Sequence, residues 1–172
     1  MQNGIRVSLS MQRVALRIDG RLAGEWDCST AAAGPGEQNG RGGTPRGAHR
    51  IRMVIGRNAP AGAVFVGRRP TGEIYTASLG ARAPERDWIL SRIIWLTGIE
   101  PGFNRGGAVD TLRRLIYIHG TPDTEPMGVP RSHGCIRMRN QAVIELADQC
   151  WPGMAVVIDD DPHTEASPCS GH

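Results

Sequence analysis

Short apolar runs, separated by turns and glycine-rich segments, constrain the fold of this chain most. Apolar and polar side chains alternate along residues 5–10 and again along 13–18. Between the second run and a third at 21–30 stands Asp19-Gly20, a pair typical of two-residue hairpin turns. Because a period of two places every second side chain on one face of a sheet, this pattern predicts an antiparallel meander at the N-terminus.

The middle of the chain continues the β pattern with long connections. Further strands are predicted at residues 48–55, 63–66, 73–77, 88–96, 115–119 and 154–158. The run at 88–96 is dense in Ile, Leu and Trp, and its composition also allows a short helix. Glycine and proline predict loops at 34–47, 98–108 and 120–131. Loops of this length in a compact domain are more often functional than idle.

One segment has a clear helical period. Asn140 is a good N-cap, and the helix is predicted to continue through residues 141–149. Its expected buried face, at spacings of three and four, consists of Val143, Leu146, Ala147 and Cys150. The fold class is therefore mainly β, with one domain at residues 1–158 and a flexible polar tail at 159–172.

Composition excludes several classes of function. The 172 residues are 40% hydrophobic, enough for one domain with a real core. The net charge is +3 with no basic block, so no nucleic-acid partner is expected. All twenty basic residues are arginine. A lysine Schiff base, a P-loop lysine and a lysine general base are therefore excluded.

The cysteines and the N-terminus bear on the compartment. Cys28, Cys135, Cys150 and Cys169 lack the regular spacing of a disulfide scaffold. We expect Cys28 and Cys150 to be plain buried thiols and Cys169 to be free. The first residues contain no apolar signal segment, and no stretch approaches a membrane span. The expectation is a cytoplasmic protein without a membrane partner, or an envelope protein if a leader was removed.

Candidate chemistry concentrates around Cys135. This cysteine belongs to the heptapeptide S-H-G-C-I-R-M at 132–138, which also contains His133, and His119 ends the apolar run upstream. A thiolate is the reactive form of cysteine, and a nearby imidazole can generate it. Gly134 suits backbone N–H groups aimed at an oxyanion. If the strand that ends at His119 neighbours Cys135, the pattern indicates thiol acyl transfer.

Three other interpretations remain open from the residues alone. The cysteine and both histidines could be satisfied core residues. They could instead bind a metal, although H-G-C spacing fits no common ligand pattern and no carboxylate completes the set. Ser132 could be a nucleophile, but it lacks the G-x-S-x-G elbow. The residues favour cysteine acyl transfer only slightly over these alternatives.

The ordered motifs resemble the signature of the L,D-transpeptidase catalytic domain. They comprise I-H-G-T at 118–121, S-H-G-C-I-R-M at 132–138, Asn140 and T-P-R-G at 44–47. The resemblance extends over nearly the whole chain and implies a sandwich-like β barrel with one C-terminal helix and long active-site loops. It also implies action on murein tetrapeptides or muropeptides at the diaminopimelate–D-alanine bond, acylation by carbapenems, and no metal or other cofactor.

The same resemblance implies roles for individual residues. Cys135 would be the nucleophile and His119 its base, oriented by the carbonyl of Gly120. His133 would line the site, while Gly134 and Cys135 would supply oxyanion N–H groups.

The resemblance and the loops also suggest substrate-binding residues. Arg137 would hold a substrate carboxylate or form an ordinary ion pair, and we weigh the two equally. Ser132 is a further candidate beside the nucleophile. Asn104 and Arg105 could reach the substrate from the loop at 98–108, or could serve only to solvate it.

The acceptor of the acyl group is not set by these residues. Water would give an L,D-carboxypeptidase, and an amine of a second stem peptide would give a cross-linking transpeptidase. Residues 88–110 resemble small leaderless members of the family, some of which are cytoplasmic L,D-carboxypeptidases of murein recycling. Hydrolysis is therefore slightly favoured. A remote alternative is a catalytically silent module that binds murein peptides, and the sequence indicates no oligomeric state.

Overall fold

The computed structural model describes residues 1–160 and begins with the predicted meander. Strands β1 (Gly4–Ser8), β2 (Arg13–Ile18) and β3 (Arg21–Asp27) pair antiparallel in sequence order. Asp19 and Gly20 both have positive φ, 51° and 76°, as a two-residue hairpin of primed type requires. The prediction is confirmed, although β3 ends three residues earlier than expected.

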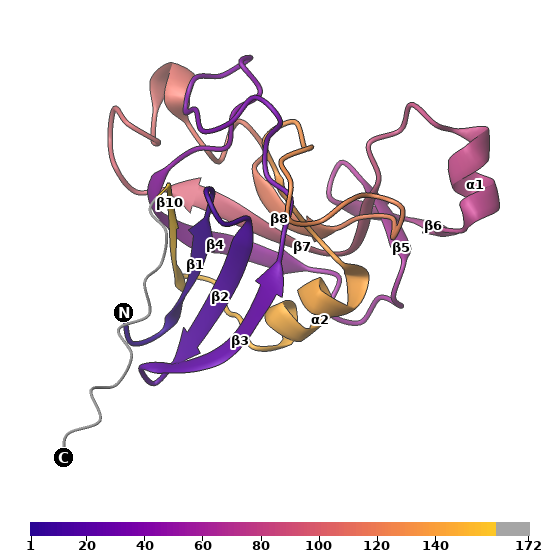
Figure 1. The fold of residues 1–172 in the computed structure, drawn as a ribbon, viewed down its shortest axis with the longest axis horizontal. Helices are drawn as coiled ribbons and strands as arrows, with labels where there is room; N and C mark the ends of the chain where they lie inside the picture. Colours follow the sequence, from indigo (N-terminus) through magenta and orange to yellow (C-terminus); the bar gives the residue numbers. More distant parts are fainter. Residues whose placement is uncertain (161–172) are drawn as a thin grey trace.

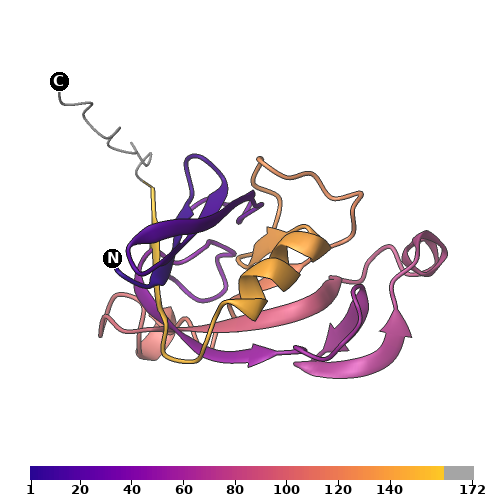
Figure 2. The ribbon, with the colours of Figure 1, turned by 90° about the horizontal axis from the view of Figure 1, so that it is seen from below.

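The strands join one sheet in the order β3-β2-β1-β10-β4-β7-β5-β6, with β8 and β9 branching from β7. The remaining strands are β4 (Gly47–Ile55), β5 (Ala63–Val66), β6 (Arg69–Ile74), β7 (Ile89–Gly98), β8 (Tyr117–Gly120), β9 (Ile136–Met138) and β10 (Ala155–Asp159). β10 pairs parallel with β1, so the last strand closes against the first (Figure 1). The fold is mainly β, as predicted, and the sheet curls into a half-barrel (Figure 2).

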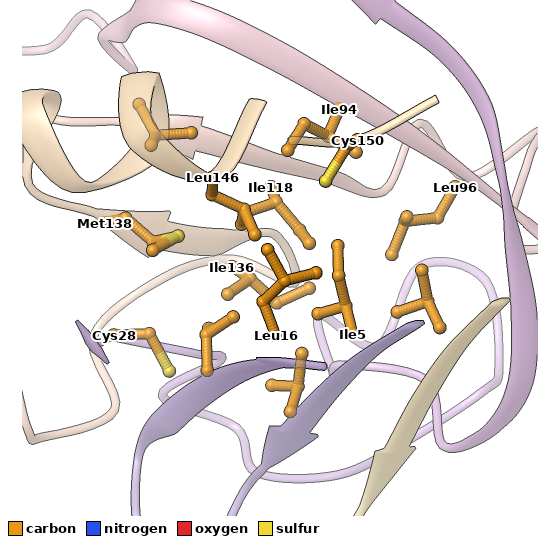
Figure 3. Packing of buried hydrophobic residues seen from close by; sticks show 14 of the residues in the cluster. Ile5, Leu16, Cys28, Ile94, Leu96, Ile118, Ile136, Met138, Leu146 and Cys150 are labelled. Carbon is orange, nitrogen blue, oxygen red and sulfur yellow. The ribbon is translucent and has the colours of Figure 1, made fainter. Parts of the chain in front are cut away.

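Helix α2 (Asn140–Asp148) covers the inside of this curl, against β7 and β8. All four residues of its predicted apolar face are buried. They join side chains from β1, β2, β7, β8 and β9 in one core (Figure 3). Since β8 and β9 carry Ile118 and Ile136 into this core, the same packing that stabilises the fold fixes the strands that lead to the candidate site.

Two local predictions are wrong. The N-cap of α2 is Arg139, not Asn140, and it makes no side-chain cap bond. The Asn140 side chain instead accepts from Ser91 Oγ at 2.6 Å and donates to the Thr121 carbonyl at 3.1 Å. Buried tertiary partners thus take the oxygen that a cap would use.

The second error concerns residues 73–77, which were predicted as a strand. β6 begins at Arg69 and ends at Ile74, and helix α1 (Ala77–Arg82) follows, with the Thr76 hydroxyl accepting from the Leu79 N–H at 3.1 Å. This helix buries none of its residues and projects beyond the sheet (Figure 2). It therefore leaves no apolar period in the sequence.

The three predicted loops are present, and the middle one contains a 3-10 turn, η1 (Gly107–Val109). Asp159 is the last residue of β10, and the rest of the predicted tail, residues 161–172, lies outside the described residues. Within residues 1–160 no helix is long and apolar enough to cross a membrane.

Candidate active site

Two neighbouring parallel strands bring the candidate catalytic residues together. β8 pairs with β9 in the register Ile118–Ile136 and His119–Arg137. Cys135 directly precedes β9, so it lies two residues before Arg137, the position opposite His119. The adjacency on which the acyl-transfer interpretation depended is therefore present.

A cavity of about 310 Å³ opens over these strand ends. Five of the sequence-predicted site residues line it: His119, Ser132, His133, Cys135 and Arg137. Its wall also includes four residues that sequence reasoning did not single out, namely Arg68, Asp87, Arg114 and Tyr117. None of these four belongs to a motif, although Tyr117 lies in the apolar run before His119 and Arg114 directly precedes that run. Cys135 and His119 thus face one shared space.

The Cys135 thiol is held by backbone groups of Leu115 and of Tyr117, the first residue of β8. The Tyr117 N–H donates to Sγ at 3.3 Å, and the thiol donates to the Leu115 carbonyl at 3.4 Å. The pKa of Cys135 is raised to about 11, chiefly by burial and further by the Asp87 carboxylate. The Tyr117 N–H and two arginines, Arg137 and Arg114, act in the opposite direction. The thiol is therefore neutral near pH 7, and it can act as a nucleophile only with a base that accepts its proton.

His119 has the tautomer and the neutral state that such a base requires. Its side chain is 1% exposed, and Nδ1 lies 2.7 Å from the Gly120 carbonyl oxygen. Since a carbonyl only accepts, Nδ1 carries the hydrogen and Nε2 keeps its lone pair. Burial is the main cause that lowers the pKa of His119; the Gly120 carbonyl and Asp87 oppose it. A neutral imidazole with a free Nε2 can accept a thiol proton.

The turn before Cys135 is fixed by two buried hydroxyl groups. Ser132 Oγ donates to the Cys135 carbonyl at 2.5 Å and accepts from the Gly134 N–H at 3.2 Å. Thr44 Oγ1 donates to the Gly134 carbonyl at 2.8 Å and accepts from the Ala31 N–H at 3.0 Å. Gly134 has φ 135°, a conformation that a side chain would strain.

This bonding pattern distinguishes the two candidate oxyanion donors, the N–H groups of Gly134 and Cys135. The Gly134 N–H is already bonded to Ser132, whereas the Cys135 N–H has no acceptor among residues 1–160. The Cys135 N–H is thus the donor that a substrate oxygen meets without displacing a protein partner. The Ser132 hydroxyl is engaged in two hydrogen bonds within the turn.

Comparison with known proteins decides the family. The family model described as the L,D-transpeptidase catalytic domain matches residues 2–158. The chain belongs to this family. A search of curated proteins returned no match.

Solved structures of L,D-transpeptidases have the same fold. The enzyme from Mycobacterium smegmatis aligns with a TM-score of 0.53 at 15% identity, over 92% of this chain and 58% of that one. L,D-transpeptidase 3 from Mycobacterium tuberculosis gives 0.54 at 16%, over 92% and 61%. The Xylanimonas cellulosilytica enzyme gives 0.51 at 20%, over 92% and 62%. This L,D-transpeptidase domain therefore spans about three fifths of the length of these structures.

Arg137 lies in the wall of the L,D-transpeptidase cavity with carboxylates around it. Its side chain approaches Asp87 at 3.4 Å and Glu125 at 3.5 Å, and it donates to the Arg131 carbonyl at 3.4 Å. The ion-pair alternative is therefore present in the structure. Each contact is longer than the 2.7–2.9 Å of a strong charge-assisted bond, so the guanidinium is loosely held.

Asn104 and Arg105 do not line this cavity. Asn104 is fully buried; its amide donates to the carbonyls of Arg46 and Ala48, and its oxygen accepts from the Glu100 N–H. It therefore shapes the loop at 98–108 from within, and the Arg105 side chain in the same loop is exposed. Among residues 1–160, no three His, Cys, Asp or Glu side chains are placed to hold a metal ion.

Proposed function

We propose that this L,D-transpeptidase-family chain is a cysteine acyl-transfer enzyme acting on murein stem tetrapeptides at the diaminopimelate–D-alanine bond. The observation that carries the proposal is the pairing of β8 with β9, which places Cys135 and His119 on one cavity with Nε2 of the imidazole free. The neutral states of both groups set the direction of proton transfer.

In the first step, His119 Nε2 takes the thiol proton while Sγ attacks the carbonyl carbon of diaminopimelate. The carbonyl oxygen becomes an oxyanion, and the Cys135 N–H donates to it. When the C–N bond breaks, the imidazolium returns the proton to the leaving amine. D-Alanine departs, and the acyl group remains as a thioester on Cys135.

In the second step we propose that water attacks the thioester, with His119 again as base, to release a tripeptide. Water needs no binding site for a second stem peptide, and the 310 Å³ cavity offers space for one peptide end. Hydrolysis suits a cytoplasmic enzyme of murein recycling. The alternative is attack by a stem-peptide amine, which gives a cross-link.

Two solved structures with the same fold contain β-lactam compounds. One is an L,D-transpeptidase in complex with imipenem, and another is the M. tuberculosis L,D-transpeptidase 3 with a faropenem-derived adduct. We propose that carbapenems acylate Cys135 in this chain as well.

The test is incubation of the protein with disaccharide tetrapeptide, followed by mass analysis of the products. Tripeptide alone supports hydrolysis, dimers support cross-linking, and no product together with no imipenem adduct refutes both. Peptide mapping should place the adduct on Cys135 and not on the buried Cys28 or Cys150. Cys135→Ala should abolish turnover and retain tetrapeptide binding, and a wild type that binds without turnover would indicate the silent module.

A further inference from the structure

A second, smaller cavity of about 180 Å³ adjoins the active-site cavity. Three residues line both spaces: Asp87, His133 and Arg137. Glu125 lines only the smaller one, from the loop between β8 and β9. The boundary between the two cavities is therefore formed by a carboxylate, an imidazole and a guanidinium, and Glu125 adds a second carboxylate on the smaller side.

The charged groups at this boundary, Arg137 and Asp87, have unused hydrogen-bonding capacity. Arg137 is 8% exposed, yet its carboxylate partners lie at 3.4 and 3.5 Å. Asp87 is half exposed, with 52% of its side chain accessible, and its ion pair in the described part of the chain is the one to Arg137 at 3.4 Å. A closed ion pair would approach about 2.8 Å. The gap leaves both groups able to accept a bound ligand's charges.

We propose that Arg137 and Asp87 together bind a side chain that ends in an amino-acid group, with Arg137 on its carboxylate and Asp87 on its ammonium. Asp87 is then a specificity-determining residue for diaminopimelate. This inference rests on the proposed function, because it assigns the side chain of the acyl donor to the smaller cavity. The backbone of the same residue reaches Cys135 in the larger one.

Electrostatics agree with this placement. Asp87 raises and Arg137 lowers the pKa of Cys135, so both groups act on the reacting sulfur. A zwitterionic side chain satisfies both groups and adds no net charge beside the thiol. A lysine side chain brings only the ammonium and leaves Arg137 without a substrate partner. A diaminopimelate whose side-chain amine is acetylated brings only the carboxylate and leaves Asp87 without one.

The experiment measures D-alanine release from three tetrapeptides, which carry meso-diaminopimelate, its side-chain N-acetyl form, or lysine at the third position. The proteins are wild type, Asp87→Asn and a matched control, Asp123→Asn, which neutralises an exposed carboxylate outside both cavities. Acetylation should lower wild-type kcat/KM about ten-fold, as expected for a partly exposed charge-assisted bond. Asp87→Asn should lose a similar factor on the free amine, mainly in KM, and little on the acetylated peptide.

Non-additivity is the decisive readout. If Asp87→Asn lowers kcat/KM equally on the free and the acetylated peptide, or if wild type does not distinguish the three peptides, the inference is overturned while the proposed function stands. If wild type releases D-alanine from none of them, the proposed function itself fails. Asp123→Asn should match wild type throughout, and equal thermal unfolding of the three proteins shows that the variants are folded.

Discussion

Replacing the buried hydroxyl of Thr44 tests whether the turn before Cys135 is held from outside the motif. Thr44 is fully buried, and its Oγ1 bridges two backbone groups, the Gly134 carbonyl and the Ala31 N–H. Thr44→Val keeps the shape of the side chain and removes both bonds. Thr44→Ser is the matched control, because it keeps the hydroxyl and removes only a methyl group.

The magnitude follows from the groups left unpaired. A buried backbone donor or acceptor without a partner costs about 1–3 kcal/mol, and the valine leaves two of them. With partial relaxation, Thr44→Val should lower the free energy of unfolding by about 2–4 kcal/mol. The serine loses one buried methyl, so its cost should be about 1 kcal/mol.

Thr44→Val should also slow the reaction of Cys135, the proposed nucleophile, because Gly134 directly precedes it. A displacement of the nucleophile by about 1 Å can cost up to ~100-fold in rate. We expect Thr44→Val to slow acylation by imipenem at least about ten-fold and Thr44→Ser to stay within a factor of about two. Urea unfolding and intact-mass kinetics measure the two effects. Equal stability of the valine and serine variants would refute the bonding argument, and unchanged acylation in a destabilised valine variant would refute its link to Cys135.

Two pH-dependent predictions rest on the buried histidines. Burial lowers the pKa of His119 below its usual value near 6.5. The rate of imipenem acylation should therefore be constant from neutral pH to below 6.5 and fall only at lower pH. A fall in rate centred above pH 6.5, or a thiolate absorbance at pH 7, would contradict a neutral His119 beside a neutral Cys135. Burial also lowers the pKa of His49 to about 4, whereas the unfolded chain has the usual value near 6.5. Because the unfolded state then binds the proton more readily, the free energy of unfolding is highest above pH 6.5 and falls by about 3 kcal/mol as the pH drops to 4. His49→Gln should flatten this part of the stability–pH curve, whereas a slope equal to wild type would assign it to other groups, His119 included.

The features that the sequence predicted are those that depend on local pattern. The N-terminal meander followed from alternation and one hairpin turn, and the buried face of α2 from a helical period. The proximity of Cys135 and His119 depended on which strands are neighbours in the sheet, and neither hydrophobic period nor residue propensity specifies strand order. Only the resemblance of the ordered motifs to a known family indicated it.

The features that the sequence missed depend on tertiary contacts. Helix α1 has no fully buried residue and Leu79 is only partly buried, so the helix has no apolar period that the sequence could show. Asn140 looked like a cap, but Ser91, which is 49 residues away, competes for its side-chain oxygen. Asp87 precedes β7, and nothing in its own segment indicates that β8 and β9 place it beside Arg137. Conversely, Asn104 was a candidate for substrate binding because it lies in the glycine-rich loop at 98–108. Its side chain is buried inside that loop and bonded to the backbone.

The protonation states of Cys135 and His119 bear on which electrophiles the thiol should react with. A thiol with a pKa of about 11 is almost wholly protonated at neutral pH, so it is a poor nucleophile toward any electrophile that reaches it alone. In the proposed mechanism, His119 takes the proton while a carbonyl oxygen lies against the Cys135 N–H. In the same proposal, a side chain bound by Asp87 and Arg137 orients the carbonyl before proton transfer, which couples binding to activation. Simple alkylating agents, which place no developing oxyanion against the Cys135 N–H, should therefore react slowly with Cys135 compared with carbapenems.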